Sequence, residues 1–258
     1  MGAITALHAT ALLLAESRVP QRDARERRAT RFARNGLLGA VAVAATALVE
    51  RPLVVRAIAV AKRRSWGIVP RVPGPPFVRA IVAVAALDYA LYLWHVLLHR
   101  VPLLWRFHLV HHVDRDCDVT TAARIHGVEL AFSAAYRVGI VLALGVTRDE
   151  YALWESLFGL SILFHHANVA LPPSVERALE RVVMTPRRHG IHHLADRDAQ
   201  HGNFASGLIA WDHLHGSVRD GDPRGPIGLP AYPDEADVTL ERLAVLPFVA
   251  QRDPWGVP

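Results

Sequence analysis

Long apolar runs alternate with short polar or proline-rich breaks along most of this chain. Residues 36–61 are almost all Gly, Ala, Val and Leu, residues 77–98 form a second run, and residues 128–146 and 151–171 form two more. A helix rises about 1.5 Å per residue, so about 20 apolar residues cross a bilayer. The pattern therefore predicts an all-α integral membrane helical bundle with about four transmembrane helices.

Three breaks indicate how the chain turns. Residues 147–150 predict a tight helical hairpin between the last two runs, so that both of its ends return to one side. Residues 62–77 contain four prolines and predict a loop, because the residue before a proline is biased away from helix. Near Pro52, residues 36–61 either cross once with a kink or turn back as two half-helices, and the pattern leaves both open.

The two ends of the chain differ from this apolar middle. Residues 3–15 are apolar but too short to cross as a straight helix, so we expect a partly inserted helix. Residues 17–34 carry seven arginines and predict a cytoplasmic interfacial helix. We therefore divide the chain into an N-terminal apolar and basic segment, a membrane-embedded domain and an extramembrane C-terminal tail, at residues 1–35, 36–217 and 218–258.

The charge of the chain restricts its partners, and its cysteine content restricts the ligands that a metal could have. Lys and Arg number 29 against 24 Asp and Glu, and an anionic membrane surface suits this excess better than nucleic acid does. The basic residues are scattered between apolar runs and do not alternate with aromatics in a groove-like patch, so we expect no nucleic acid partner. Cys117 is the single cysteine, which excludes an internal disulfide and an iron–sulfur cluster. Any metal is then held mainly by nitrogen.

Ten of the 15 histidines fall into groups with metal-ligand spacing. Residues three or four apart share one face of a helix, so each group presents its imidazoles in one direction. A single histidine is usually a core or surface residue, but burying so many titratable rings without a shared partner is costly. The groups are His95 and His99; His108, His111 and His112; His165 and His166; and His189, His192 and His193.

Imidazole suits iron, zinc, copper and nickel, so ligand type alone does not name the metal. The histidines are too many for one ion and fit two, such as a dinuclear iron site that binds and splits dioxygen. A site at the cytoplasmic end of apolar spans indicates a lipid substrate, although Lys62, Arg63 and Arg64 then lie outside, against the usual charge bias. Candidate acceptors for the far ring N–H groups, each of which is equally a solvated polar residue, are Asp88, Asp114, Asp118, Glu129, Asn168 and Asp196.

Six motifs, in order, carry a family resemblance: DYALYLWHVLLHR, RFHLVHH, RIHGVE, FHHANV, TPRRHGIHH and NFASGLIAWDHLHGS. Over residues 88–217 the chain resembles the fatty acid hydroxylase and sterol desaturase superfamily of membrane di-iron enzymes. The resemblance implies a histidine-rich helical cap that holds a dinuclear metal site. It assigns as metal ligands the three family boxes His95 and His99; His108, His111 and His112; and His189, His192 and His193; together with His126 and His166.

The same resemblance implies oxygen-dependent hydroxylation or desaturation of a membrane lipid, whether fatty acyl, sterol or other isoprenoid. It implies two Fe ions, with Zn possible in purified protein, and O2 as co-substrate. The sequence has no glycine-rich dinucleotide fingerprint and no haem-binding segment, so we expect electrons from an external redox protein. Two alternatives stay open: a zinc-dependent membrane lipid hydrolase, and a non-catalytic metal- or lipid-binding membrane protein.

Overall fold

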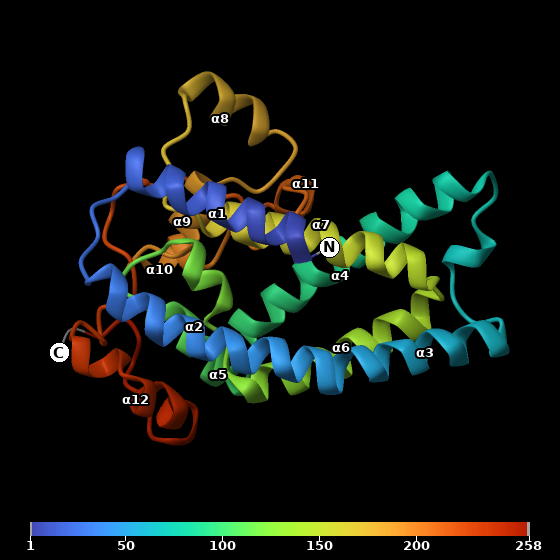
Figure 1. Ribbon diagram of the computed structural model, residues 1–258, viewed down its shortest axis with the longest axis horizontal. Helices are drawn as coiled ribbons and strands as arrows, with labels where there is room; N and C mark the ends of the chain where they lie inside the picture. The colour runs from blue at the N-terminus through green and yellow to red at the C-terminus, as the bar shows by residue number, and fades with distance from the viewer. Residues whose placement is uncertain (1, 257–258) are drawn as a thin grey trace.

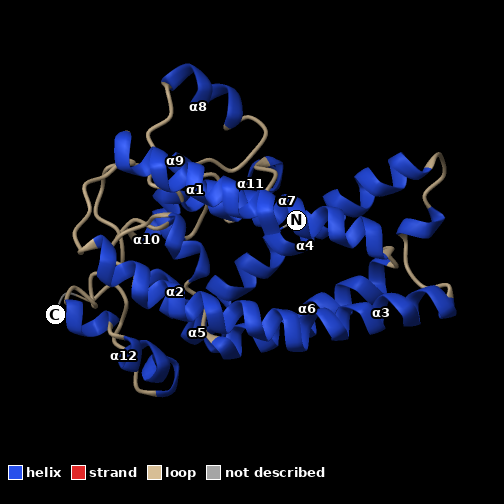
Figure 2. Cartoon of the chain, in the orientation of Figure 1, coloured by secondary structure: helices blue, strands red, loops and turns tan. Residues whose placement is uncertain are grey.

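A computed structural model describes residues 2–256, and that part of the chain is helical with connecting loops and no strand (Figure 2). The α-helices are α1 (Gly2–Arg18), α2 (Arg28–Ala45), α3 (Arg51–Arg64), α4 (Pro76–Arg100), α5 (Pro102–His112), α6 (Gly127–Leu144), α7 (Arg148–His166), α8 (Pro173–Leu179), α9 (Pro186–His192), α10 (Arg197–Gln200), α11 (Ala210–His215) and α12 (Leu240–Val245). Five short segments complete the set: the π-helix η1 (Thr46–Glu50) and the 3-10 helices η2 (Val69–Arg71), η3 (Val119–Ala123), η4 (Glu235–Val238) and η5 (Leu246–Phe248). The all-helical expectation is confirmed for the described residues.

The α2, η1 and α3 segments form one continuous helical run, which lies along one side of the molecule (Figure 1). Pro52 has no N–H for the usual helical hydrogen bond and would disturb a regular α-helix. The preceding turn is therefore wider: the N–H of Arg51 bonds to the carbonyl of Thr46, five residues back. The structure thus decides for a single run and excludes the pair of half-helices.

Within residues 2–256, three helices are long and apolar enough to cross a membrane: the run Arg28–Arg64, α4 and α6. The expected number was about four. The helix α7 has 19 residues but is not among the candidates. It carries Arg148, Asp149, Glu150 and Glu155 and ends in two histidines, and these residues lower its hydropathy.

An apolar core holds these long helices together. Leu91 and Trp94 of α4 pack with Val141 of α6, Trp154 of α7 and Ile58 of α3. The opposite faces of the helices leave large apolar side chains exposed, among them Val43, Leu48 and Ile81. Large apolar side chains exposed in such number are typical of a surface that faces lipid or another protein.

The basic N-terminal segment differs from the expected interfacial helix. The helix α1 ends at Arg18, residues 19–27 are not helical, and α2 begins at Arg28. Arg31 and Arg34 are buried, whereas the sequence pattern predicts a position at the membrane surface for them. Burial is possible because carboxylates meet them, and an ion pair compensates a buried charge that would otherwise be costly.

Residues 218–256 pack back on the rest of the molecule. Tyr232, Leu243 and Leu246 form a buried apolar cluster with Leu109 and Val110 of α5. Arg106 of α5 donates to the carbonyls of Pro247 and Val249, both at 2.7 Å. The C-terminal segment thus supports the helix that carries the central group of histidines.

Candidate metal centre

Four helices bring ten histidines together at one end of the long bundle. The helix α4 ends with His95 and His99, and Pro102 starts α5 after an extended residue, so the chain turns and brings the second group back toward the first. The helix α7 ends at His166, and Thr185 caps the start of α9, which carries the last group. The ten buried rings are those of His95, His99, His108, His111, His112, His165, His166, His189, His192 and His193.

Eight of these rings form two groups of four. We call His95, His99, His112 and His192 cluster A, and His111, His166, His189 and His193 cluster B. In each cluster, one nitrogen from every ring lies within 4.8 Å of the others. Four converging imidazoles are a ligand set that binds iron or zinc.

The ring nitrogens of cluster B approach one another closely. The Nε2 atom of His166 lies 3.2 Å from that of His111 and 3.1 Å from that of His189, and His193 Nε2 lies 3.1 Å from His189 Nε2. Nitrogens bound to one metal at about 2.1 Å and about 90° to 109° apart would lie about 3.0 to 3.4 Å from one another. The separations in cluster B therefore fit a shared ion.

Cluster A also fits a shared ion, because one nitrogen of each of its rings is buried without a partner in the described chain. The Nε2 atoms of its four members are all buried and have no hydrogen-bond partner within the described chain. A buried polar atom without a partner is costly and requires an explanation. A metal ion bound at the centre of cluster A would give all four atoms a partner.

Backbone carbonyls orient several of these rings. His95 Nδ1 donates to the carbonyl of Phe204 and His192 Nδ1 to that of Gly202, each at 2.7 Å. His166 Nδ1 donates to the carbonyl of Ile162 at 2.8 Å. An N–H on Nδ1 leaves Nε2 as the nitrogen with a lone pair, so these bonds select the tautomer that binds a metal.

The surroundings also keep the imidazoles neutral. Burial, reinforced by neighbouring histidines, lowers the pKa of His111, His112, His189 and His193 well below its usual value. Burial likewise lowers the pKa of His166, to about 4. Neutral imidazole is the form that binds metal, so both clusters are in their ligand state at neutral pH.

His108 and His165 lie beside the clusters. The ring centroid of His108 lies 5.0 Å from that of His99 in cluster A and 5.1 Å from that of His111 in cluster B, and its Nδ1 contacts Glu129 Oε1 at 3.2 Å. The His165 ring lies 4.2 Å from that of His189, and its Nδ1 has no partner among the described residues. His165 belonged to the sequence groups but not to the expected ligands.

His126, by contrast, is not brought to the clusters. Its Nδ1 accepts from the N–H of Val128 and caps the start of α6, and its Nε2 lies 3.4 Å from the carbonyl of Ala244. Its ring packs with those of Phe107 and Phe248. This position gives His126 a capping role, because its two nitrogens already have partners.

Among the polar residues expected to support the histidines, only Glu129 contacts one of them in the described chain. Asn168 bonds to the backbone of Arg22, and Asp196 accepts from the N–H of Ala199 as the cap of α10. The acceptors for the ring N–H groups are mostly carbonyl oxygens. A sequence does not single out carbonyl acceptors, because every residue has one.

Asp88 and Asp212 fix the loop that supplies one of these carbonyls. Asp88 Oδ2 accepts from the N–H of Leu208 at 2.9 Å and from Trp211 Nε1 at 2.7 Å. Asp212 accepts from the N–H of Phe204 at 2.9 Å and from that of Ala205 at 2.8 Å. These bonds hold the Phe204 carbonyl against His95. The NFASGLIAWDHLHGS motif contained this signal, since Asp212 lies within it.

Asp114 fixes the loop that follows His108, His111 and His112. Its carboxylate accepts from Arg31 Nη2 at 2.9 Å and lies 3.8 Å from Arg124 Nη1. Burial alone would raise the pKa of Asp114, but the two guanidinium groups outweigh it and hold that pKa well below its usual range. Arg31 also pairs with Asp118, so both acidic residues stabilise the loop and contact no histidine.

A cavity opens beside the clusters, between α4, α6 and α7. It encloses about 630 Å³, its open mouth included. Apolar side chains from these helices form much of its wall, and the clusters form one end of it. The histidines that line it are His95, His108, His111, His165, His166 and His189.

Comparison with known protein families identifies the family to which this chain belongs. A model of the fatty acid hydroxylase family matches residues 80–217, which is more than half of the chain and includes the residues of both clusters. The chain belongs to the fatty acid hydroxylase family. This confirms the resemblance that the motifs indicated.

Relatives of this family member include two kinds of lipid enzyme. It is 24% identical over 177 residues to the ornithine lipid hydroxylase OlsE of Rhizobium tropici, covering 69% of this chain and 50% of that protein. It is 28% identical over 149 residues to human alkylglycerol monooxygenase, covering 57% of this chain and 32% of that enzyme. The chain thus matches half or less of the length of these relatives. No solved structure gives a significant match.

Proposed function

We propose that this protein is a membrane-embedded lipid hydroxylase that uses two iron ions and O2. The observation that carries the proposal is the pair of four-histidine clusters, whose free or converging Nε2 atoms fit one metal ion each. Iron bound there would supply the oxygen activation that no side chain provides. Cluster A would hold one ion and cluster B the other.

The substrate is a lipid with a hydrocarbon chain. Apolar side chains form much of the wall of the cavity beside the clusters, and two of the helices around it, α4 and α6, are apolar enough to cross a membrane. Two relatives are named as enzymes that add oxygen to a lipid, ornithine lipid hydroxylase and alkylglycerol monooxygenase. These names favour hydroxylation over desaturation for this chain.

Hydroxylation also requires electrons from outside the chain. One C–H bond, one O2, two electrons and two protons give one C–OH and one water, so each turnover consumes two electrons. Because the sequence has no dinucleotide fingerprint, we infer that an external redox protein delivers them. We place the clusters on the cytoplasmic side, where such a donor can reach them.

His108 lies between the two clusters, and we propose that Glu129 orients its ring for metal binding. His108 has a buried Nε2 without a partner in the described chain, and its Nδ1 contacts the Glu129 carboxylate. A carboxylate that holds one ring nitrogen fixes the orientation of the ring and raises the basicity of the other nitrogen. His108 is therefore proposed as a further ligand that either ion can share.

The test combines metal analysis with turnover of protein purified in detergent. We expect about two metal ions per chain, and after iron loading we expect lipid- and reductant-dependent O2 consumption with a hydroxylated lipid as product. A single bound ion would contradict the two-cluster proposal. Lipid ester hydrolysis by the zinc form without O2 would instead establish the hydrolase, and two bound ions without any turnover would indicate a binding protein.

A further inference from the structure

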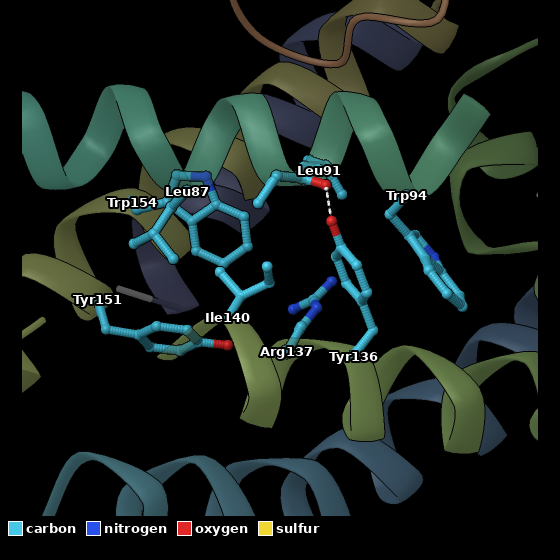
Figure 3. Close-up of a pocket in the computed structure, with 9 residues that line it drawn as sticks. Leu87, Leu91, Trp94, Tyr136, Arg137, Ile140, Tyr151 and Trp154 are labelled. Atoms are coloured by element: carbon cyan, nitrogen blue, oxygen red, sulfur yellow. Dashed lines mark hydrogen bonds between the residues drawn. The ribbon is translucent and has the colours of Figure 1, made fainter. Parts of the chain in front are cut away.

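Arg137 is a charged residue near the middle of α6, a helix apolar enough to cross a membrane. Its side chain points inward between α4 and α7 (Figure 3). Its Nη1 donates to Glu50 Oε1 at 2.9 Å, and Glu50 is itself buried. An ionisable residue inside an apolar bundle is costly to keep and commonly has a function.

Two buried polar side chains of α7 lie beside this guanidinium. The Tyr151 hydroxyl faces Arg137 and has no other partner in the described structure (Figure 3). Trp154 is 3% exposed, and its Nε1 has no hydrogen-bond partner among residues 2–256. The Arg137 guanidinium lies 5.3 Å from the centre of a Trp154 ring. An indole N–H that is buried without a partner indicates a place where an acceptor belongs.

Arg137 also joins two cavities. The smaller one lies among Leu87, Ile140, Tyr151 and Trp154 (Figure 3), and the larger one reaches the histidine clusters. Both cavities are lined by Arg137 together with Leu91 and Trp94. Along α6, Arg137 follows Glu129 by eight residues, which corresponds to about 12 Å.

We propose that Arg137, Tyr151 and Trp154 line a subsite for neutral oxygen atoms of the lipid, such as those of an ester, an ether or a hydroxyl. These side chains offer mainly donors, which suits an oxygen. The Arg137–Glu50 pair is neutral overall, so a carboxylate or phosphate would remain without a counter-charge in this apolar surrounding.

The consequence is positional selectivity. A lipid held by its oxygen at Arg137 extends along the larger cavity and places one part of its chain at the clusters. The subsite thus selects which carbon is oxidised. This inference rests on the proposed lipid hydroxylation, so its test includes a binding measurement that needs no turnover.

The test uses the double variant E50Q/R137Q. A single change would leave one buried charge unpaired and would destabilise the bundle, whereas the two amides leave no unpaired charge and can bond to each other. The matched control is R51Q/E155Q, which removes an exposed ion pair that lies 3.2 Å apart between α3 and α7 and lines neither cavity. The probes are a monoalkylglycerol, which carries ether and hydroxyl oxygens, and octadecane, which carries none.

We expect metal-free E50Q/R137Q to bind the monoalkylglycerol at least about tenfold more weakly than wild type and the control, and octadecane equally well. In the iron-loaded protein, its product should spread over several carbons where wild type gives one. Equal monoalkylglycerol affinity in all three proteins, or an unchanged single product, would overturn the subsite. Wild-type protein that binds two irons and oxidises neither probe, nor ornithine lipid, would instead count against the hydroxylase proposal, and the binding measurement would still decide the subsite.

Discussion

Replacing His193 by Ala tests whether cluster B holds a metal ion. His193 is 1% exposed, and its Nε2 lies 3.1 Å from His189 Nε2. The change removes one of the four nitrogens of cluster B and leaves those of cluster A in place. The expected result is a protein that inserts and folds, keeps one ion and loses lipid oxidation.

The size of the effect follows from the lost bond. Removing an outer partner of a metal ligand typically costs 10- to 100-fold in metal affinity, and removing a ligand itself costs more. A loss above about 100-fold exceeds about 2.8 kcal/mol of binding free energy. Metal content should therefore fall from about two ions per chain to about one after dialysis against a weak chelator, as measured by inductively coupled plasma mass spectrometry.

His201→Ala is the matched control, because His201 is partly exposed, belongs to neither cluster and bonds through Nδ1 to the Arg197 carbonyl. This change should alter the free energy of unfolding by no more than about 0.5 kcal/mol and leave about two ions bound. His193→Ala protein that retains both ions and full activity would remove cluster B from the proposed site.

Further predictions concern Glu129, the buried ion pairs of Asp114 and the topology of the chain. Glu129→Gln removes the carboxylate that contacts His108 and should lower the rate of lipid oxidation about 10- to 100-fold with the fold intact; an unchanged rate would exclude this role. Asp114→Ala leaves Arg31 and Arg124 without their shared buried partner and should cost about 3 to 5 kcal/mol in the free energy of unfolding, measured by denaturation in detergent. The folded pKa of Asp114 lies below its ordinary value near 3.8. Its contribution to the free energy of unfolding is therefore present above about pH 5 and declines as the pH falls through about 4. A pH scan in which the stabilities of wild type and Asp114→Asn decline in parallel would contradict this. Single cysteines placed in a Cys117→Ser background should all react with a membrane-impermeant reagent from the cytoplasmic side, and opposite labelling of any one would break the single-site topology; the positions are Arg115, Arg187 and Arg197.

The sequence by itself determined the helical class and most of the ligand candidates. Apolar runs of spanning length predict helices in lipid, where the backbone must bond within its own segment. Spacings of three and four residues place histidines on one helix face, and the structure does bring those of α4, α5 and α9 together. These are local properties, so they can be read along the chain.

Only the tertiary structure decided how the histidines divide. His111 and His112 are neighbours in sequence but belong to different clusters, and so do His192 and His193. Adjacent residues on a helix point about 100° apart, so α5 and the segment of α9 each direct histidines to both clusters, and the remaining ligands of each cluster come from other helices. Grouping by motif cannot reveal this division.

The buried arginines show the same limit. Arg31 lies in a strongly basic segment, which favours a membrane surface, yet it pairs with Asp114 and Asp118 more than eighty residues away. The charges along a sequence show which residues need an ion-pair partner. They do not show where in the fold that partner lies. Folding brought the carboxylates to the arginine, and the resulting ion pairs hold the loop that follows the central histidines.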